Sequence, residues 1–151
     1  MSTENQRFKS ILIPTDGSER ATTAVKHGVD FAKEIGAKVT GLTVTEPFHV
    51  WSLKPSQLEY TPAEYKKHSK THAEKVLGGV LAAAGSADVS CETVHVEHEH
   101  PYQAIIDTAA SKGCDLILMA SHGRRGVAAV VLGSETVKVL THSKFPVLVY
   151  R

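Results

Sequence analysis

The chain has 151 residues, with 17 Lys and Arg against 16 Asp and Glu. This length suits one domain, 1–151, with a substantial core. A net charge of +1 and scattered basic residues argue against nucleic acid as the main partner. No apolar run reaches the ~20 residues of a membrane-spanning helix, so no membrane partner is expected. A polar start without a signal-peptide pattern and only two cysteines predict a reducing, cytoplasmic location.

Apolar runs alternate with segments of helical period along the chain. The runs predict five strands, at 8–13, 39–44, 89–96, 116–119 and 147–150. The periodic segments predict helices over 21–35, from 62 to 84, over 101–111 and after 133. Thr61 followed by Pro62 is typical of a helix start, and Gly36 of a helix end. In the last helix, Val137 and Leu140 share the expected apolar face. Such alternation predicts right-handed βαβ crossovers and a parallel sheet covered on both faces.

The most informative stretch follows the fourth predicted strand. It reads Ala120-Ser121-His122-Gly123, then nine residues, then Gly133-Ser134 before the last helix. Small residues let a backbone approach an anion closely, and the first amides of a helix have no partner within it. We expect Gly133 to adopt dihedrals closed to other residues and Ser134 to supply an N-cap hydroxyl. The stretch therefore predicts a phosphate site.

This spacing resembles the universal stress protein family, whose nucleotide-binding members carry G-x-x-G, nine residues, then G-[ST]. Here Ala120 replaces the first glycine. The resemblance extends to Ile11–Ser18 near the start and to Pro146–Val149 near the end, so it spans nearly the whole chain. It implies a three-layer, doubly wound α/β sandwich similar to the adenine-nucleotide α-hydrolase fold, with five parallel strands in the order 3-2-1-4-5.

The resemblance also implies a stress-response protein that binds ATP, or AMP or ADP, with Mg²⁺ carried by the nucleotide. In such sheets, ligands bind beyond the carboxyl ends of the strands where the strand order reverses. The loops after the first and fourth strands would then face one crevice. The residues implied to bind the nucleotide are Pro14, Thr15, Asp16, Val44, Met119, Ala120, His122, Gly123, Arg124, Gly133, Ser134 and Glu135.

The first of these loops also fits a plainer interpretation. Asp16 and Ser18 suit a turn that caps the following helix, with Gly17 in an unusual conformation. The resemblance instead assigns Pro14, Thr15 and Asp16 to adenosine, with the Asp16 carboxylate on a ribose hydroxyl, and places Val44 against the adenine.

The second loop leaves similar alternatives. Arg124 and Arg125 fit solvated surface charges as well as phosphate ligands, and His122 fits the surface equally well. The methyl group of Ala120 falls where a backbone would approach the ligand, and alanine does not easily adopt a positive φ. We therefore expect nucleotide binding to be retained but weakened.

The other reactive residues give no separate site. His68 and His72 share one face of a predicted helix, whereas alternation puts His95 and His98 on opposite faces of a strand. No Cys and His set has zinc spacing, and surface histidines are favoured. The two cysteines, Cys91 and Cys114, are interpreted as small buried hydrophobic residues.

Three functions remain open from the sequence. The favoured one is a nucleotide-dependent regulator of an unidentified protein partner, acting as a homodimer through its C-terminal edge strand, 146–151. The second is an interaction protein that binds no nucleotide. The third is a slow ATPase or autophosphorylating protein with Ser134 or Ser121 as acceptor. No P-loop lysine follows Gly133, so binding is favoured over turnover and no catalytic residue is assigned.

Overall fold

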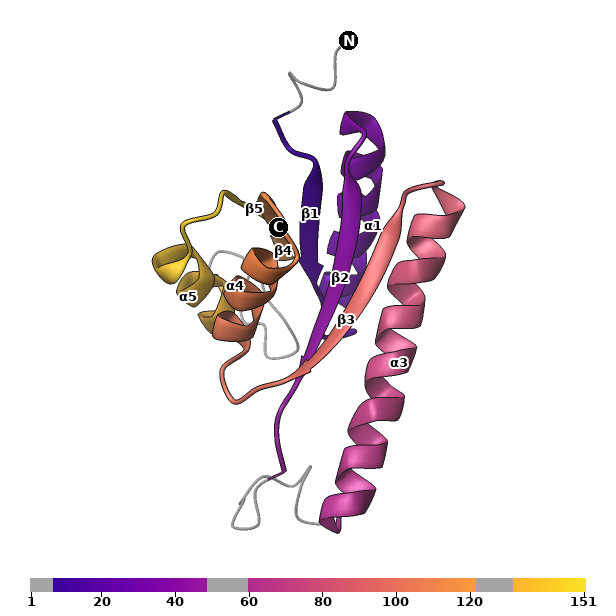
Figure 1. Cartoon of the computed structure of the whole chain (residues 1–151), viewed down its shortest axis with the longest axis vertical. Helices are drawn as coiled ribbons and strands as arrows, with labels where there is room; N and C mark the ends of the chain where they lie inside the picture. The colour runs from indigo at the N-terminus through magenta and orange to yellow at the C-terminus, as the bar shows by residue number, and fades with distance from the viewer. Residues whose placement is uncertain (1–6, 49–59, 122–131) are drawn as a thin grey trace.

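The computed structural model describes residues 7–48, 60–121 and 132–151. Its strands are β1 (Ser10–Pro14), β2 (Lys38–Thr45), β3 (Cys91–Glu97), β4 (Leu116–Ala120) and β5 (Val147–Tyr150). Its helices are α1 (Glu19–Ile35), α3 (Pro62–Ser86), α4 (Pro101–Ser111) and α5 (Ser134–His142). Strands and helices follow one another along the chain, as the sequence predicts (Figure 1).

The strands form one parallel sheet in the order β3-β2-β1-β4-β5. This is the predicted order. From β1 the chain builds outward through β2 to β3, and then returns to the other side of β1 for β4 and β5. The strand order therefore reverses between β1 and β4, and the loops that follow these two strands leave the sheet at neighbouring positions.

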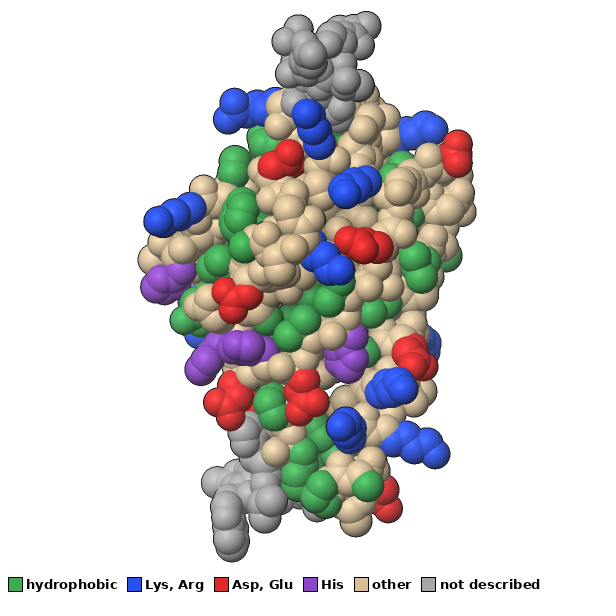
Figure 2. Space-filling view, viewed as in Figure 1, with side chains coloured by type: hydrophobic (Ala, Val, Ile, Leu, Met, Phe, Trp, Pro, Cys, Tyr) green, Lys and Arg blue, Asp and Glu red, His purple; other side chains and the backbone are tan. Residues whose placement is uncertain are grey.

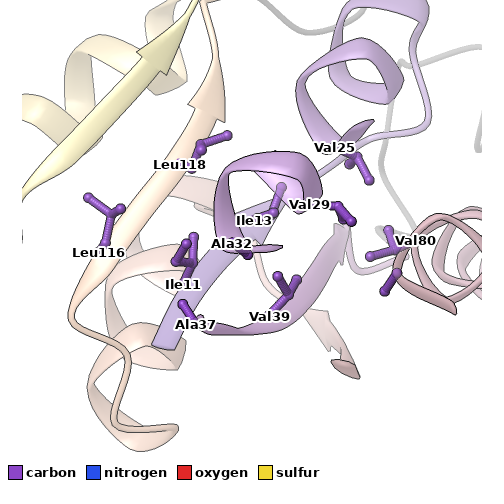
Figure 3. Packing of buried hydrophobic residues seen from close by; sticks show 11 residues of the cluster. Ile11, Ile13, Val25, Val29, Ala32, Ala37, Val39, Val80, Leu116 and Leu118 are labelled. Carbon is purple, nitrogen blue, oxygen red and sulfur yellow. The ribbon is translucent and has the colours of Figure 1, made fainter. Parts of the chain in front are cut away.

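Helices cover both faces of the sheet (Figure 1). Because side chains alternate along a strand, β1 sends Ile11 and Ile13 to one face and Leu12 to the other. On the first face they pack with α1 and α3 residues such as Val29 and Val80 (Figure 3). On the second face Leu12 belongs to a cluster with residues of α4 and α5. Both faces of the central strand are buried, which explains its continuous apolar run.

The predicted helix ends are present. The N-cap of α3 is Thr61, whose hydroxyl accepts from the Glu64 amide at 3.2 Å while the Glu64 carboxylate accepts from the Thr61 amide at 3.2 Å. This is a capping box, and Pro62 follows it at the first helical position. Helix α1 ends at Gly36, which has φ 72° and closes the helix in the left-handed conformation.

Two predicted strands begin later than expected. The strand predicted from Phe8 begins at Ser10, because the amides of Lys9 and Ser10 donate to the Asp115 carboxylate at 3.0 and 3.1 Å. The strand predicted from Val89 begins at Cys91, because the Val89 amide donates to a carbonyl at the end of α3. In both cases a backbone amide near the expected strand start donates to an acceptor outside the sheet.

The predicted apolar face of α5 is wrong. The buried side chains of this helix are Thr136 and Val139, at 3% and 0% exposure. Val137 and Leu140 are instead 44% and 42% exposed. The helix turns a threonine toward the sheet because its hydroxyl has backbone partners there, which apolar periodicity does not register.

Among the described residues, none of the helices combines the length and the apolar character needed to cross a bilayer. On the face seen in Figure 2, acidic and basic side chains are interspersed, so neither sign of charge dominates that surface.

Candidate functional site

The loop after β1 forms a tight turn that starts α1. The Thr15 amide donates to the Leu42 carbonyl at 2.8 Å, so the β1–β2 ladder continues past the end of β1. The Asp16 carboxylate accepts from the Ser18 amide at 2.9 Å, and Ser18 is the N-cap of α1. Gly17 has φ 79°, a conformation that side chains disfavour. The predicted turn is confirmed, and it places Asp16 just beyond the carboxyl end of β1.

The loop after β4 is closed at its base by three hydrogen bonds. The Gly133 amide donates to the Ser121 carbonyl at 2.7 Å. The Thr136 hydroxyl lies 3.0 Å from the Ala120 carbonyl oxygen and 3.2 Å from that of Ser121. On the other side, the Ser121 amide donates to the Tyr150 carbonyl at 2.8 Å. The end of β4, the start of α5 and the edge strand β5 therefore meet at Ser121.

The N-terminus of α5 differs from the prediction in two respects. Its N-cap is Gly133, and Ser134 is the first helical residue, so the Ser134 hydroxyl is not the cap. Gly133 has φ −63° and ψ 154°, an ordinary extended conformation rather than one reserved for glycine. Within the described residues, no side chain caps the helix there. The first amides of α5 have no partner within the helix and no capping oxygen at the N-cap position.

The Glu135 side chain is occupied at a neighbouring helix. Its carboxylate accepts from the Tyr102 amide at 2.9 Å and lies 3.6 Å from the Lys138 ammonium. Lys138 also lies over the Tyr102 ring, 5.7 Å from its centre. The negative charge in the first turn of α5 therefore caps the start of α4 and is balanced by a lysine, which reduces its repulsion of an anion near α5.

Two of the residues predicted to bind the nucleotide, Met119 and the expected adenine contact Val44, lie on one face of the sheet. Met119 is 6% exposed and belongs to the cluster on the α4 and α5 face, and Val44 packs against that cluster. Pro14, at the end of β1, is half-buried. Ala120 ends β4 and does not have a positive φ. In the described part of the chain, Asp88 is the one non-glycine residue that does. The alanine therefore needs none of the conformational freedom of the glycine that it replaces.

The structure thus brings two groups of predicted residues to the carboxyl edge of the sheet. One is Thr15 and Asp16 after β1, and the other is Ala120 with the start of α5 after β4. Three further predicted residues, His122, Gly123 and Arg124, lie outside the described residues.

Sequence reasoning missed Thr136. It lies three residues after Gly133 and fills a buried position of α5 with a hydroxyl. One signal could have identified this residue. A threonine at a helix position that faces the sheet has a buried hydroxyl, and a buried hydroxyl requires a hydrogen-bond partner.

A groove of about 710 Å³ runs between α1 and α3, on the face opposite Met119 and Val44. Its lining includes Lys26 and Lys75 along with several valines. Val25, Val29 and Val80 beneath it are 4%, 1% and 2% exposed, so these three side chains are covered by the fold itself.

The histidines have local partners in the structure. His95 lies on β3 with its Nε2 2.7 Å from the Thr45 hydroxyl. His98 lies beyond β3, so the expected alternation within one strand does not apply, and its Nδ1 accepts from the His100 amide at 2.8 Å. Within the described ranges, no group of three His, Cys, Asp or Glu side chains is placed to hold a metal ion.

The two cysteines differ in burial. Cys114 is buried at 4% exposure, as predicted, whereas Cys91 at the start of β3 is only partly buried. Burial raises the pKa of the Cys91 thiol, and the charge of neighbouring Glu92 raises it further, against a lowering by a backbone hydrogen bond from Gly41. Neither feature activates the thiol as a nucleophile.

Comparison with known proteins agrees with this architecture. The model of the universal stress protein family matches residues 7–151. Universal stress protein MJ0531 of Methanocaldococcus jannaschii is 32% identical over 149 residues, with 95% of this chain and 82% of that protein covered. Among solved structures, that of hypothetical protein MJ0577 has a TM-score of 0.78 at 29% identity, with 95% of each chain covered.

Two other similar structures contain nucleotides. A universal stress protein in complex with cAMP has a TM-score of 0.65 at 21% identity, covering 96% of this chain and 98% of that one. A universal stress protein of Archaeoglobus fulgidus in complex with dAMP has a TM-score of 0.70 at 16% identity, covering 96% and 99%. At these identities the likeness concerns the fold.

Proposed function

Because this chain belongs to the universal stress protein family, we propose that it binds an adenine nucleotide at the carboxyl ends of β1 and β4. ATP is the proposed ligand, with AMP or ADP as alternatives, and Mg²⁺ arrives with the nucleotide. The cAMP and dAMP complexes of two structural neighbours support this class, since both ligands combine adenine with a phosphate.

The observation that carries the proposal is the position of the two loops. β1 and β4 are neighbours at the point where the strand order reverses, which is where parallel α/β sheets bind ligands. There, α5 begins with a glycine N-cap and no side-chain cap. The Glu135 carboxylate and the Thr136 hydroxyl are both bonded elsewhere. An incoming phosphate would therefore find the first amides of α5 without a competing side-chain oxygen.

Each group of residues then has a role in the proposed site. The Asp16 carboxylate accepts from a ribose hydroxyl, beside Pro14 and Thr15. Val44 and Met119 form the apolar contact with the adenine. The phosphates lie against Ala120, Gly133 and the start of α5, where Ser134 and Glu135 offer backbone amides, while the Gly133 amide is bonded to the Ser121 carbonyl. From the loop outside the described residues, His122, Gly123 and Arg124 complete the proposed set.

Substitution at Gly133 tests the proposal. Gly133→Asp places a carboxylate at the N-cap of α5, where it caps the helix amides and repels phosphate. Gly133→Asn has nearly the same shape without the charge. Since Gly133 has ordinary dihedrals, neither side chain strains the backbone. We expect Gly133→Asp to abolish measurable ATP binding in calorimetry, and Gly133→Asn to weaken it by a smaller factor.

Thermal unfolding of the same variants provides the control. Asp and Asn are both good N-cap residues, so both variants should unfold at or slightly above the wild-type temperature. Wild-type protein that shows no heat with millimolar ATP, and that carries no nucleotide through purification by mass spectrometry, would refute nucleotide binding.

We further propose that the nucleotide regulates a homodimer formed through β5, and that this dimer contacts a protein partner in the stress response. β5 is an outer strand of the sheet, and among the residues that the structure describes no strand pairs with its far edge, which a second copy could extend. Leu148 on this strand is 41% exposed. Val137 and Leu140 on α5 are also exposed, which gives the same end of the molecule apolar surface to bury.

Light scattering during size exclusion tests the dimer. We expect a dimer for the wild type and a monomer for Val149→Pro, because proline removes an amide from the edge strand and fits poorly beside a second strand. Leu81→Lys, on α3 at 46% exposure, is the matched surface control and should remain dimeric. A wild-type protein that is monomeric at all concentrations would disprove the dimer.

A further inference from the structure

We propose that Thr136 is a positioning residue for the phosphate end of the nucleotide site, and that it acts through its hydroxyl group. The inference rests on the proposed nucleotide function and adds to it a residue that contacts no ligand. Thr136 is the third residue of α5, in its first turn, and its hydroxyl bonds back to the end of β4.

The hydroxyl joins the helix to the strand. It lies 3.0 Å from the Ala120 carbonyl oxygen and 3.2 Å from the Ser121 carbonyl oxygen, and Thr136 is 3% exposed. A single hydroxyl proton is thus shared between two consecutive carbonyls, that of Ala120 at the end of β4 and that of Ser121 directly after it. In this dry location no water replaces a lost hydroxyl without cost, because buried polar groups need partners.

The two links from α5 hold it at separate points. The Gly133 amide fixes the cap residue to Ser121, and the Thr136 hydroxyl fixes the helix one turn further on. The buried Val139 and the bond between Glu135 and the Tyr102 amide hold the helix against α4 and the sheet, but they do not join its first turn to the end of β4. The Thr136 hydroxyl makes that connection, and through it Thr136 helps to set the direction in which the first amides of α5 point.

The strand side of this link is itself well held. The Ser121 amide donates to the Tyr150 carbonyl at 2.8 Å in β5. The Tyr150 ring stacks on His27 of α1, with ring centres 4.4 Å apart and planes 17° from parallel. Thr136 therefore attaches the start of α5 to a point fixed by β4, β5 and α1. The affinity of a site for phosphate falls when the amides that donate to the phosphate are displaced by a fraction of an ångström.

A purely structural role for Thr136 predicts a different outcome from a positioning role. If the residue only fills space, the methyl group matters, and valine should replace threonine well. If the hydroxyl aims the helix, serine should replace threonine well. A positioning role also affects only ligands with phosphates, because adenosine makes no contact with the first turn of α5 in the proposed site.

The experiment compares the affinities of ATP and adenosine by calorimetry for three variants. We expect Thr136→Val to weaken ATP affinity about tenfold, which corresponds to the loss of about one hydrogen bond to the phosphates. Adenosine affinity should stay within about twofold of the wild type. Thr136→Ser should stay within about threefold of wild type for both ligands. Thr141→Val is the matched control, since its hydroxyl also bonds a backbone carbonyl of α5, that of Val137 at 2.8 Å, but far from the loop base. It should behave as wild type.

Three results of the binding experiment would overturn the proposal: unchanged ATP affinity in Thr136→Val, an equal loss of ATP and adenosine affinity, or a loss in Thr136→Ser as large as in Thr136→Val. Hydrogen exchange at the Gly133 amide in nucleotide-free protein separates this inference from the proposed function. Exchange should quicken at least about fivefold in Thr136→Val and stay unchanged in Thr136→Ser. If wild type binds no ATP, the proposed function fails, yet quickened exchange still supports Thr136 as the residue that aligns α5. Unchanged exchange overturns it.

Discussion

Replacing Gly28 with alanine should destabilise this protein, although the same change stabilises most helices. Gly28 lies in α1 where the helix crosses the sheet. A Cβ atom added there would lie 2.7 Å from Cδ1 of Ile13 and 3.0 Å from Cδ2 of Leu118. Both neighbours are in the core, at 0% and 1% exposure. They cannot move apart without displacing other packed side chains.

The size of the effect follows from two opposing terms. Alanine in a helix interior gains about 1 kcal/mol over glycine. Overpacking a core typically costs about 1–3 kcal/mol, and contact with two buried side chains places this site toward the upper end. The net loss in the free energy of unfolding should be about 1–2 kcal/mol. For a protein of this length, each 1 kcal/mol lowers the unfolding temperature by about 2–4 °C.

Gly78→Ala provides the matched control. Gly78 lies inside α3, and a Cβ atom there would have nothing within 4 Å, so only the helix-propensity gain of about 1 kcal/mol should remain. Urea unfolding followed by circular dichroism should therefore give a lower midpoint for Gly28→Ala and a higher one for Gly78→Ala. A Gly28→Ala midpoint at or above that of the wild type would show that α1 is not seated as closely on the sheet as the distances indicate.

Two further predictions concern the start of the sheet and the partly buried thiol. Asp115→Ala should lower the free energy of unfolding by about 1–3 kcal/mol in urea titrations, because the amides of Lys9 and Ser10 lose their carboxylate partner; no change would contradict that role. Cys91 should react with iodoacetamide at pH 8 more slowly than free glutathione, because its raised pKa leaves less thiolate; a faster rate would contradict it, and Cys91→Ser identifies the reacting site. Since the pKa of this thiol in the folded protein lies above its ordinary value of 9.0, its contribution to stability is present below that pH and decreases as the pH rises through the folded pKa.

The sequence was sufficient for the fold because local signals and global pattern agree. The buried run Ile11–Ile13 and the capping signal at Thr61 both mark elements that the structure contains. Where a predicted strand began too early, a backbone amide at its start had a partner outside the sheet. The Val89 amide closes α3, and the amides before β1 bond to Asp115, which is distant in the sequence.

The site was less predictable because it depends on hydrogen bonds between distant segments. The spacing identified Gly133 but did not show that its dihedrals are ordinary. A glycine in such a motif can serve either an unusual backbone conformation or a close approach of the backbone to a ligand, and the sequence does not distinguish the two. The short helix α5 shows the limit of apolar periodicity, because its exposed Val137 suggested the wrong face. The bonds of Glu135 to α4 and of Thr136 to β4 depend on tertiary structure.

The alanine that replaces the family's first glycine can now be judged from its position in β4. Leu118 packs on the α1 face and Met119 on the opposite face, so strand alternation sends the Ala120 methyl to the α1 face. That direction leads away from Val44 and Met119, where the adenine is proposed to pack. Ala120 also has no positive φ. The sequence alone predicts weakened binding, but this geometry leaves the methyl little to obstruct. Ala120→Gly should therefore change ATP affinity in calorimetry by less than about threefold, within the ~0.6 kcal/mol that corresponds to such a factor. A gain of tenfold or more would show that the methyl does reach the nucleotide and that β4 ends differently when the ligand is bound.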